Sequence, residues 1–192
     1  MRKRIKDIRR EELLKATLKT IGDIGLQNIT VAKLSSTAGM SQGMVHHYFK
    51  NKAEIIEAAI RYVNTQLRDN LITEVNSVTT PKDRLFKIID VNFSERWFNS
   101  EITQLWVSFC AEVPFNPTFY RIQRVLHNRM NSNLFNCLKQ LLPADKASNV
   151  TEELSNMIDG LWLRHSVNSS NLTPEKAIQC ITEYLNNLGI HR

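Results

Sequence analysis

The chain has 192 residues, of which 42% are hydrophobic and 23% charged, a composition typical of a folded protein rather than a disordered one. No apolar run approaches the roughly 20 residues of a membrane-spanning helix, and the basic start "MRKRIKDIRREELL" lacks the apolar core and cleavage site of a secretory signal. Cys110, Cys137 and Cys180 are far apart and odd in number, so we expect free thiols in a reducing cytoplasm.

The excess positive charge lies in the first quarter of the chain. Residues 1–52 hold 11 Lys and Arg against 4 Asp and Glu, whereas residues 53–192 hold 14 against 15. This asymmetry favours a polyanionic partner for the first segment, nucleic acid before an anionic membrane. A merely solubilising face is the alternative that charge alone leaves open.

Apolar residues recur with a period near 3.6 along nearly the whole chain, and no stretch alternates between apolar and polar residues. In the first part Gly25 and Gly39 are suitable C-terminal stops, and Thr30 and Ser41 are suitable N-terminal caps. The helices predicted there span residues 7–24, 31–38, 42–49 and 52–76.

Prolines mark most helix starts in the second part. Pro81, Pro117 and Pro174 stand where a first helical turn accepts them, Ser100 is a candidate cap, and Pro143 closes a helix. The helices predicted there span residues 81–93, 101–113, 117–142, 145–167 and from 174 onward. The sequence therefore predicts an all-α fold of nine helices.

Two of the predicted helices, 31–38 and 42–49, are joined by the three residues Gly39, Met40 and Ser41. This is the length and chemistry of a helix-turn-helix, in which the second helix enters the DNA major groove. Glycine at the turn can adopt a positive φ, and the small Gly43 on the second helix would allow close approach. Helix 7–24 would pack across both.

Metal binding and catalysis are weaker interpretations of the same segment. His46 and His47 are adjacent, so on a helix their side chains point about 100° apart and cannot share a metal ion. No nucleophile, acid–base pair or phosphate loop accompanies them. We expect no metal, no cofactor and no catalytic residue; an all-helical enzyme acting on a cationic amine remains a remote alternative.

The stretch "TVAKLSSTAGMSQGMVHHYFKNKAEIIEAAI" resembles the DNA-binding segment of TetR-family transcriptional regulators. The resemblance covers about residues 8–60, and the cap, the turn glycine, the Ser-x-Gly and the Tyr-Phe-x-x-Lys all match. It implies a nine-helix TetR-like fold with a DNA-binding domain at residues 1–52 and a ligand-binding and dimerisation domain at residues 53–192. His46 stands where much of the family has tyrosine.

The helix-turn-helix interpretation assigns DNA contacts to individual residues. Side chains on the exposed face of the second helix would read base edges: Gln42, Met44 and His46. Other residues would bind phosphates, with Ser41 and Gly43 completing the surface: Thr30, His47, Tyr48 and Lys52. Phe49 is expected in the core, and the arm Arg2, Lys3 and Arg4 could reach the minor groove.

All three tryptophans and most phenylalanines lie beyond residue 85. Aromatic rings together with an acid are what a quaternary ammonium ion requires, and five residues could supply them: Trp106, Phe109, Glu112, Asp159 and Trp162. The alternative is that the rings are ordinary core and that Asp159 pairs with an arginine at a helix junction.

Two later segments, "LWVSFCAEVPFNPTFYRIQRVLHNRMNSNL" and "MIDGLWLRHSV", are similar to TetR-family repressors that respond to choline and control glycine betaine synthesis. The resemblance implies a cytoplasmic repressor that binds pseudo-palindromic operator DNA and is released by choline. Cys110 departs from the aromatic residue expected there. A repressor that senses another cationic or hydrophobic molecule, and a DNA-architectural protein without a ligand, stay open.

The last two helices are expected to form the surface of a homodimer. Apolar residues recur there at helical spacing, and a mid-helix glycine would allow close packing of a partner helix. The predicted interface residues are Gly160, Ile178, Ile181, Leu185 and Leu188. The alternative is that these helices only close the core of their own subunit.

Overall fold

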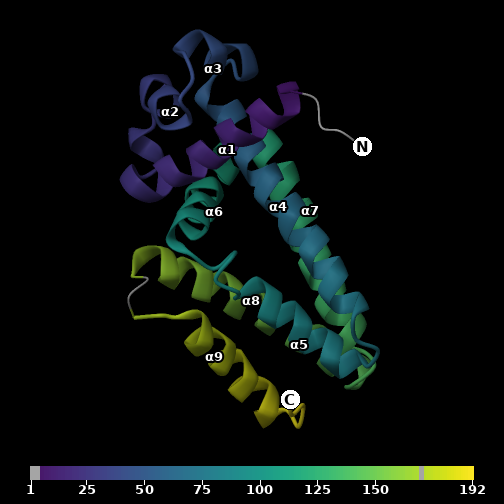
Figure 1. Ribbon diagram of the computed structural model, residues 1–192. Helices are drawn as coiled ribbons and strands as arrows, with labels where there is room; N and C mark the ends of the chain where they lie inside the picture. Colours follow the sequence, from purple (N-terminus) through teal and green to yellow (C-terminus); the bar gives the residue numbers. More distant parts are fainter. Residues whose placement is uncertain (1–4, 169–170) are drawn as a thin grey trace.

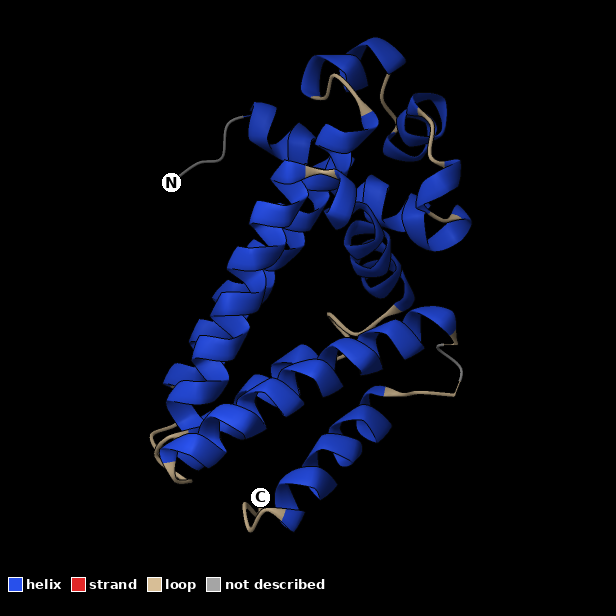
Figure 2. Cartoon of the chain, turned by 180° about the vertical axis from the view of Figure 1, so that it is seen from behind, coloured by secondary structure: helices blue, strands red, loops and turns tan. Residues whose placement is uncertain are grey.

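The computed structural model describes residues 5–168 and 171–192. Within these ranges the chain forms nine α-helices and no strand (Figure 2), which confirms the predicted all-α fold. The helices are α1 (Ile5–Ile24), α2 (Val31–Ala38), α3 (Gln42–Tyr48), α4 (Lys52–Asn76), α5 (Pro81–Asn92), α6 (Ser100–Glu112), α7 (Pro117–Leu138), α8 (Ala144–Val167) and α9 (Pro174–Asn187), with short 3-10 turns η1 (Leu26–Asn28) and η2 (Val113–Phe115). The arm Arg2, Lys3 and Arg4 lies outside the described residues.

Helices α1, α2 and α3 gather at one end of the molecule (Figure 1). Their apolar stripes meet in one core, in which Leu13, Ile21, Leu34 and Val45 are fully buried. The first turns of α4 join this core, and α1 packs against both α2 and α4. The three-helix unit is therefore built onto the long helix α4 rather than tethered by a loose linker.

The predicted turn chemistry is present in this unit. Gly39 ends α2 in the left-handed region, with φ of 61°, where a side chain would be strained. The Ser41 hydroxyl oxygen accepts from the amide of Met44 at 3.2 Å and so caps α3. Thr30 caps α2 in the same way through the amide of Lys33.

Several predicted boundaries were wrong by one to four residues. Helix α6 begins at Ser100, because Asn99 is the cap and its Oδ1 accepts from the amide of Ile102 at 3.1 Å. Helix α7 ends at Leu138 instead of residue 142, and residues 139–142 form a turn and a bend before Pro143. Helix α3 ends before Phe49, which turns to extended geometry and is buried.

The remaining helices form a second body below the three-helix unit (Figure 1). Helix α4 runs down one side with α7 alongside, and pockets along their seam are lined by residues of both. Helix α5 packs against α4 and α7, and α8 packs against α6 and α7. Helix α6 also packs against α1, so it joins the two parts of the fold. Among the described residues, no helix has the length and apolar character needed to cross a membrane.

Candidate DNA-binding surface and effector cavity

Helix α3 is held to the fold by one buried side chain, Val45, and by Phe49 just beyond its end. Its other side chains up to residue 47 are exposed, including the predicted base-reading residues Gln42, Met44 and His46. Met44 is 40% exposed, which leaves its thioether available for contact. The helix thus presents a mixed polar and apolar face at the end of the molecule (Figure 1).

The predicted phosphate-binding residues lie beside this face and differ in their exposure and in the contacts that they make. His47 is exposed and its ring contacts the edge of the half-buried Tyr48, with centroids 5.6 Å apart. The Lys52 ammonium donates to the carbonyl oxygen of Gln27 at 3.2 Å. An ammonium has three N–H donors, so Lys52 can hold this contact and still bind a phosphate.

The start of α4 carries a variant of the capping box, in which the reciprocal bond comes from Lys50 instead of the N-cap residue Asn51; the sequence analysis did not recognise it. Asn51 Oδ1 accepts from the amide of Glu54 at 2.9 Å, and the Glu54 carboxylate accepts from the amide of Lys50 at 2.8 Å. The box occupies two amides that a phosphate could otherwise bind. Phosphate binding here therefore depends more on lysine side chains than on the helix end.

The structure adds two basic side chains to the surface beyond those predicted. Lys33 and Lys50 are exposed; Lys33 is in the first turn of α2 beside Thr30, and Lys50 follows Phe49. Both lysines belong to the excess positive charge of residues 1–52, which was the only sequence feature that could have indicated them. Charge alone does not show which lysines lie beside α3, the helix predicted to read the bases.

A cavity of about 90 Å³ lies among α4, α5, α6, α7 and α8. Much of its wall is apolar, with Val63, Leu67, Leu105, Met130 and Ile158 among its lining residues. A concave, mostly apolar site with a few polar groups is the usual form of a small-molecule site.

Three of the five predicted ligand residues line this cavity: Trp106, Asp159 and Trp162. The Trp106 and Trp162 rings meet edge to face, with centroids 6.3 Å apart and planes at 74°. They form a corner that presents two aromatic surfaces. Phe109 is fully buried and packs against Trp106 at a centroid distance of 5.8 Å, so it supports the corner without lining the cavity.

Glu112 was wrongly predicted to face the ligand. It is the exposed last residue of α6 and is not part of the cavity wall. The helical stripe that placed it with Phe109 continues past the cavity, where α6 gives way to η2. Glu112 therefore cannot balance the charge of a ligand inside.

Asp159 is the acid of the cavity wall. It lines the cavity but is also exposed to solvent. Partial loss of solvation beside the neighbouring helices raises the pKa of its carboxyl group, and the nearby His127 opposes that rise. Burial, followed by the negative charge of Asp159, raises the pKa of Cys110 to about 12, so this thiol stays protonated at neutral pH. A cation in the cavity would favour the charged form of Asp159.

Two polar atoms in the wall have no hydrogen-bond partner within the described part of the chain: Trp162 Nε1 and Gln123 Oε1. Leaving such a group unsatisfied costs about 1–3 kcal/mol, so a bound molecule with a hydroxyl or carboxylate would relieve that cost. Sequence reasoning missed Gln123, because a single polar residue on a long helix does not reveal which side faces inward.

The predicted dimer residues divide into two groups. Ile181 and Leu185 are fully buried in the single chain, so they pack in the core of their own subunit, and the expectation that they meet a partner is wrong. Ile178 and Leu188 are half-buried. A Cβ at Gly160 would meet no atom within 4 Å, so the face of α8 around this glycine has room for an approaching helix.

Comparison with known proteins agrees with this arrangement. Residues 13–59 match the family described as bacterial regulatory proteins of the tetR family, and residues 81–189 match the C-terminal domain of BetI-type transcriptional repressors. The chain is 33% identical over 179 residues to the HTH-type transcriptional regulator BetI of Rhizobium meliloti, covering 93% of this chain and 88% of that protein. It is 34% identical over 178 residues to BetI of Brucella anthropi, covering 93% and 92%.

Solved structures share the fold. A putative transcriptional regulator from Saccharomonospora viridis in complex with choline superposes with a TM-score of 0.82 at 17% identity, covering 94% of this chain and 96% of that one. A TetR transcription regulator from Haloarcula marismortui gives 0.81 at 21% identity, covering 94% and 98%.

A helix-turn-helix unit mounted on a helical body with an internal cavity defines a ligand-sensing transcriptional regulator. The chain belongs to the TetR family and carries the C-terminal domain of its BetI-type repressors. The relatives are regulators of transcription and not enzymes.

Proposed function

We propose that this protein represses genes for choline uptake and glycine betaine synthesis, a response to osmotic stress, and that choline releases it from its operator. In this proposal residues 1–52 bind pseudo-palindromic DNA in the cytoplasm, and residues 53–192 sense the ligand and form the homodimer. The names of the BetI relatives and the choline complex of the S. viridis protein support this assignment.

The observation that carries the proposal is the corner formed by Trp106 and Trp162 beside Asp159. A quaternary ammonium group cannot donate hydrogen bonds, so it is recognised by aromatic faces and by a negative charge. Each well-placed ring contributes about 0.5–2 kcal/mol. The unpartnered Trp162 Nε1 and Gln123 Oε1 can donate to and accept from the choline hydroxyl group.

The size of the cavity connects binding to DNA release. Its volume of about 90 Å³ is below the roughly 150 Å³ of an engineered cavity that accepts benzene, and in this proposal a ligand of that size moves the surrounding helices apart. Helix α4 is one of them: Val63 and Leu67 line the cavity, while Ile55 and Ile56 lie in the core shared with the DNA-binding unit. A ten-fold loss of operator affinity needs about 1.4 kcal/mol of ligand preference for the wider state.

The test compares two substitutions of the half-buried Trp106. Trp106→Leu keeps apolar volume and removes the ring, whereas Trp106→Phe keeps a ring. Isothermal titration of the full chain should show choline binding weakened roughly 2–30-fold in the leucine variant and less in the phenylalanine variant. Operator release, followed by fluorescence anisotropy, should shift to higher choline concentration in parallel. Release of DNA by Trp106→Leu at the wild-type choline concentration would contradict the proposed site.

A neutral isostere separates a choline sensor from a sensor of hydrophobic molecules. In 3,3-dimethylbutan-1-ol a carbon atom replaces the choline nitrogen, so the shape is kept and the charge is lost. It should bind more weakly than choline, and Asp159→Asn should reduce this difference. Equal release of DNA by both compounds would favour the alternative of a hydrophobic effector.

A further inference from the structure

A second group of charged residues lines the same cavity: Arg68 on α4 and Arg129 on α7. Arg129 is half-buried, and its pKa is lowered first by burial and then by the positive charge of Arg68, so the two guanidinium groups lie near each other. Arg68 donates two hydrogen bonds to Asp69, at 2.9 and 2.7 Å. Arg129 has no acidic partner among residues 5–168 and 171–192.

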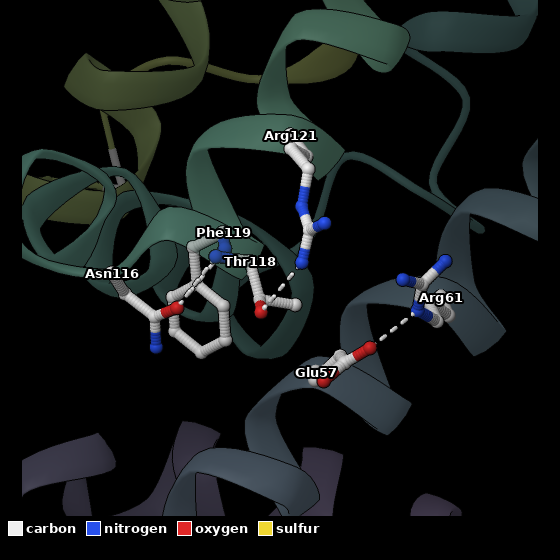
Figure 3. Close-up of polar contacts among 6 residues, drawn as sticks. All are labelled: Glu57, Arg61, Asn116, Thr118, Phe119 and Arg121. Carbon is white, nitrogen blue, oxygen red and sulfur yellow. Dashed lines mark hydrogen bonds and ion pairs between the residues drawn. The ribbon is translucent and has the colours of Figure 1, made fainter.

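Two other arginines along the seam between α4 and α7 do have polar partners (Figure 3), unlike Arg129 within the described part of the chain. Arg61 pairs with Glu57 at 2.8 Å, and Arg121 donates to the Thr118 hydroxyl group at 3.3 Å. Arg129 lines both the groove that contains these two arginines and the ligand cavity. A partly buried charge is normally paired, because desolvation without a counter-charge is costly.

The acid of the cavity does not serve as this counter-charge. No ion pair joins Asp159 to either arginine in the described part of the chain. The cavity wall thus combines two tryptophans and an acid from α6 and α8 with two arginines from α4 and α7.

We infer that the effector cavity binds a zwitterion, with a quaternary ammonium group at the two tryptophans and a carboxylate at Arg129. This deepens the proposed function and rests on it, because both use the same cavity. The buried Trp162, which is 7% exposed and whose Nε1 is unpartnered, supplies a further donor for a carboxylate oxygen. Choline engages only the tryptophans and the acid, whereas a betaine also engages Arg129.

Isothermal titration of the full chain with glycine betaine, choline and tetramethylammonium tests the inference. Glycine betaine should bind, and Arg129→Gln should weaken it roughly 10–100-fold, the range for a charged hydrogen bond. Choline and tetramethylammonium should bind Arg129→Gln at least as tightly as wild type, because a like charge has been removed. Arg129→Lys should retain part of the betaine affinity, and the matched control Arg121→Gln should change neither ligand.

The outcomes separate the inference from the proposed function. Binding of choline without glycine betaine would overturn the inference and leave the choline-responsive repressor intact. Absence of binding by all three compounds would overturn the proposed function itself. Equal weakening of choline and betaine in a folded Arg129→Gln variant, with urea unfolding unchanged, would show that Arg129 only shapes the cavity and would overturn the inference.

Discussion

Two glycines within the helix-turn-helix, one in its turn and one in α3, allow a direct test of how α3 meets DNA. Gly39 has φ of 61°, whereas Gly43 lies inside α3 with helical geometry. A Cβ at Gly39 would meet nothing within 4 Å, and one at Gly43 would meet only the Ser41 Oγ at 4.0 Å. Alanine at either position therefore acts on the free protein through the backbone and not through collisions.

The expected effects on stability have opposite signs. Gly43→Ala places a better helix former in α3 and should raise the free energy of unfolding by about 0.5–1 kcal/mol. Gly39→Ala forces a side chain into the left-handed region and should lower it by about 1–2 kcal/mol. For a chain of this size 1 kcal/mol corresponds to about 2–4 °C in Tm.

The effect on DNA binding should not follow stability. Gly43 is exposed on the face that carries Gln42, Met44 and His46, so a methyl group there intrudes between helix and duplex. Overpacking of a close contact costs about 1–3 kcal/mol, or roughly 5–100-fold in affinity. Gly39→Ala leaves this face unchanged and should bind DNA like wild type at temperatures where it is folded.

Differential scanning calorimetry and fluorescence anisotropy, with a duplex selected from random sequence by the full chain, measure both quantities. Gly43→Ala should be more stable and yet bind more weakly. A more stable variant with wild-type affinity would show that this face of α3 does not approach DNA. A Gly43→Ala variant that is less stable than wild type would contradict the helical assignment of α3.

Five further substitutions have defined outcomes. Lys52→Ala should weaken binding to all duplexes alike and reduce the log–log salt dependence by about 0.9, whereas Gln42→Ala should relax base preference at one position of each half-site. Gly160→Glu should leave the subunit folded but shift sedimentation towards monomer, and an unchanged dimer would place the interface elsewhere. Burial lowers the pKa of His165, so the unfolded chain binds more protons at this residue than the folded chain does. The free energy of unfolding should therefore fall as the pH drops below about 6.5. In urea titrations His165→Gln should make this fall smaller. Gly22→Ala should destabilise the chain by about 1–3 kcal/mol and blunt the choline response, and a full response would argue against coupling through α1 and α6.

Local signals in the sequence predicted most of the fold. Proline at first turns, Gly39 at a helix end and Ser41 as a cap act within a few residues, so helix positions and the turn could be read directly. The errors arose where several neighbouring residues compete for one role. Asn99 and Ser100 are both good caps, and only the backbone geometry shows that Asn99 is used.

The candidate site was only partly predictable, because helical periodicity gives the relative directions of side chains but not their surroundings. Three of the predicted ligand residues, Trp106, Asp159 and Trp162, line the cavity. Ile181 and Leu188 belong to the same apolar stripe of α9. Part of this stripe faces the core of the subunit, and Ile181 is fully buried there. Arg129 carried no sequence signal, since its missing counter-charge is a property of five packed helices.

The cavity is connected to the recognition helix by two routes of different kinds. Helix α4 is continuous from the cavity to the core of the DNA-binding unit. Helix α6 carries Trp106 in the cavity wall. Near the start of the same helix Glu101 packs closely against α1, since a Cβ at Gly22 would lie 2.6 Å from Glu101 Cγ. A ligand that moves α6 must therefore also move α1, which packs against α2 and through it positions α3. Because such coupling is reciprocal, the proposed function requires operator DNA to weaken choline binding by the same factor by which choline weakens operator binding.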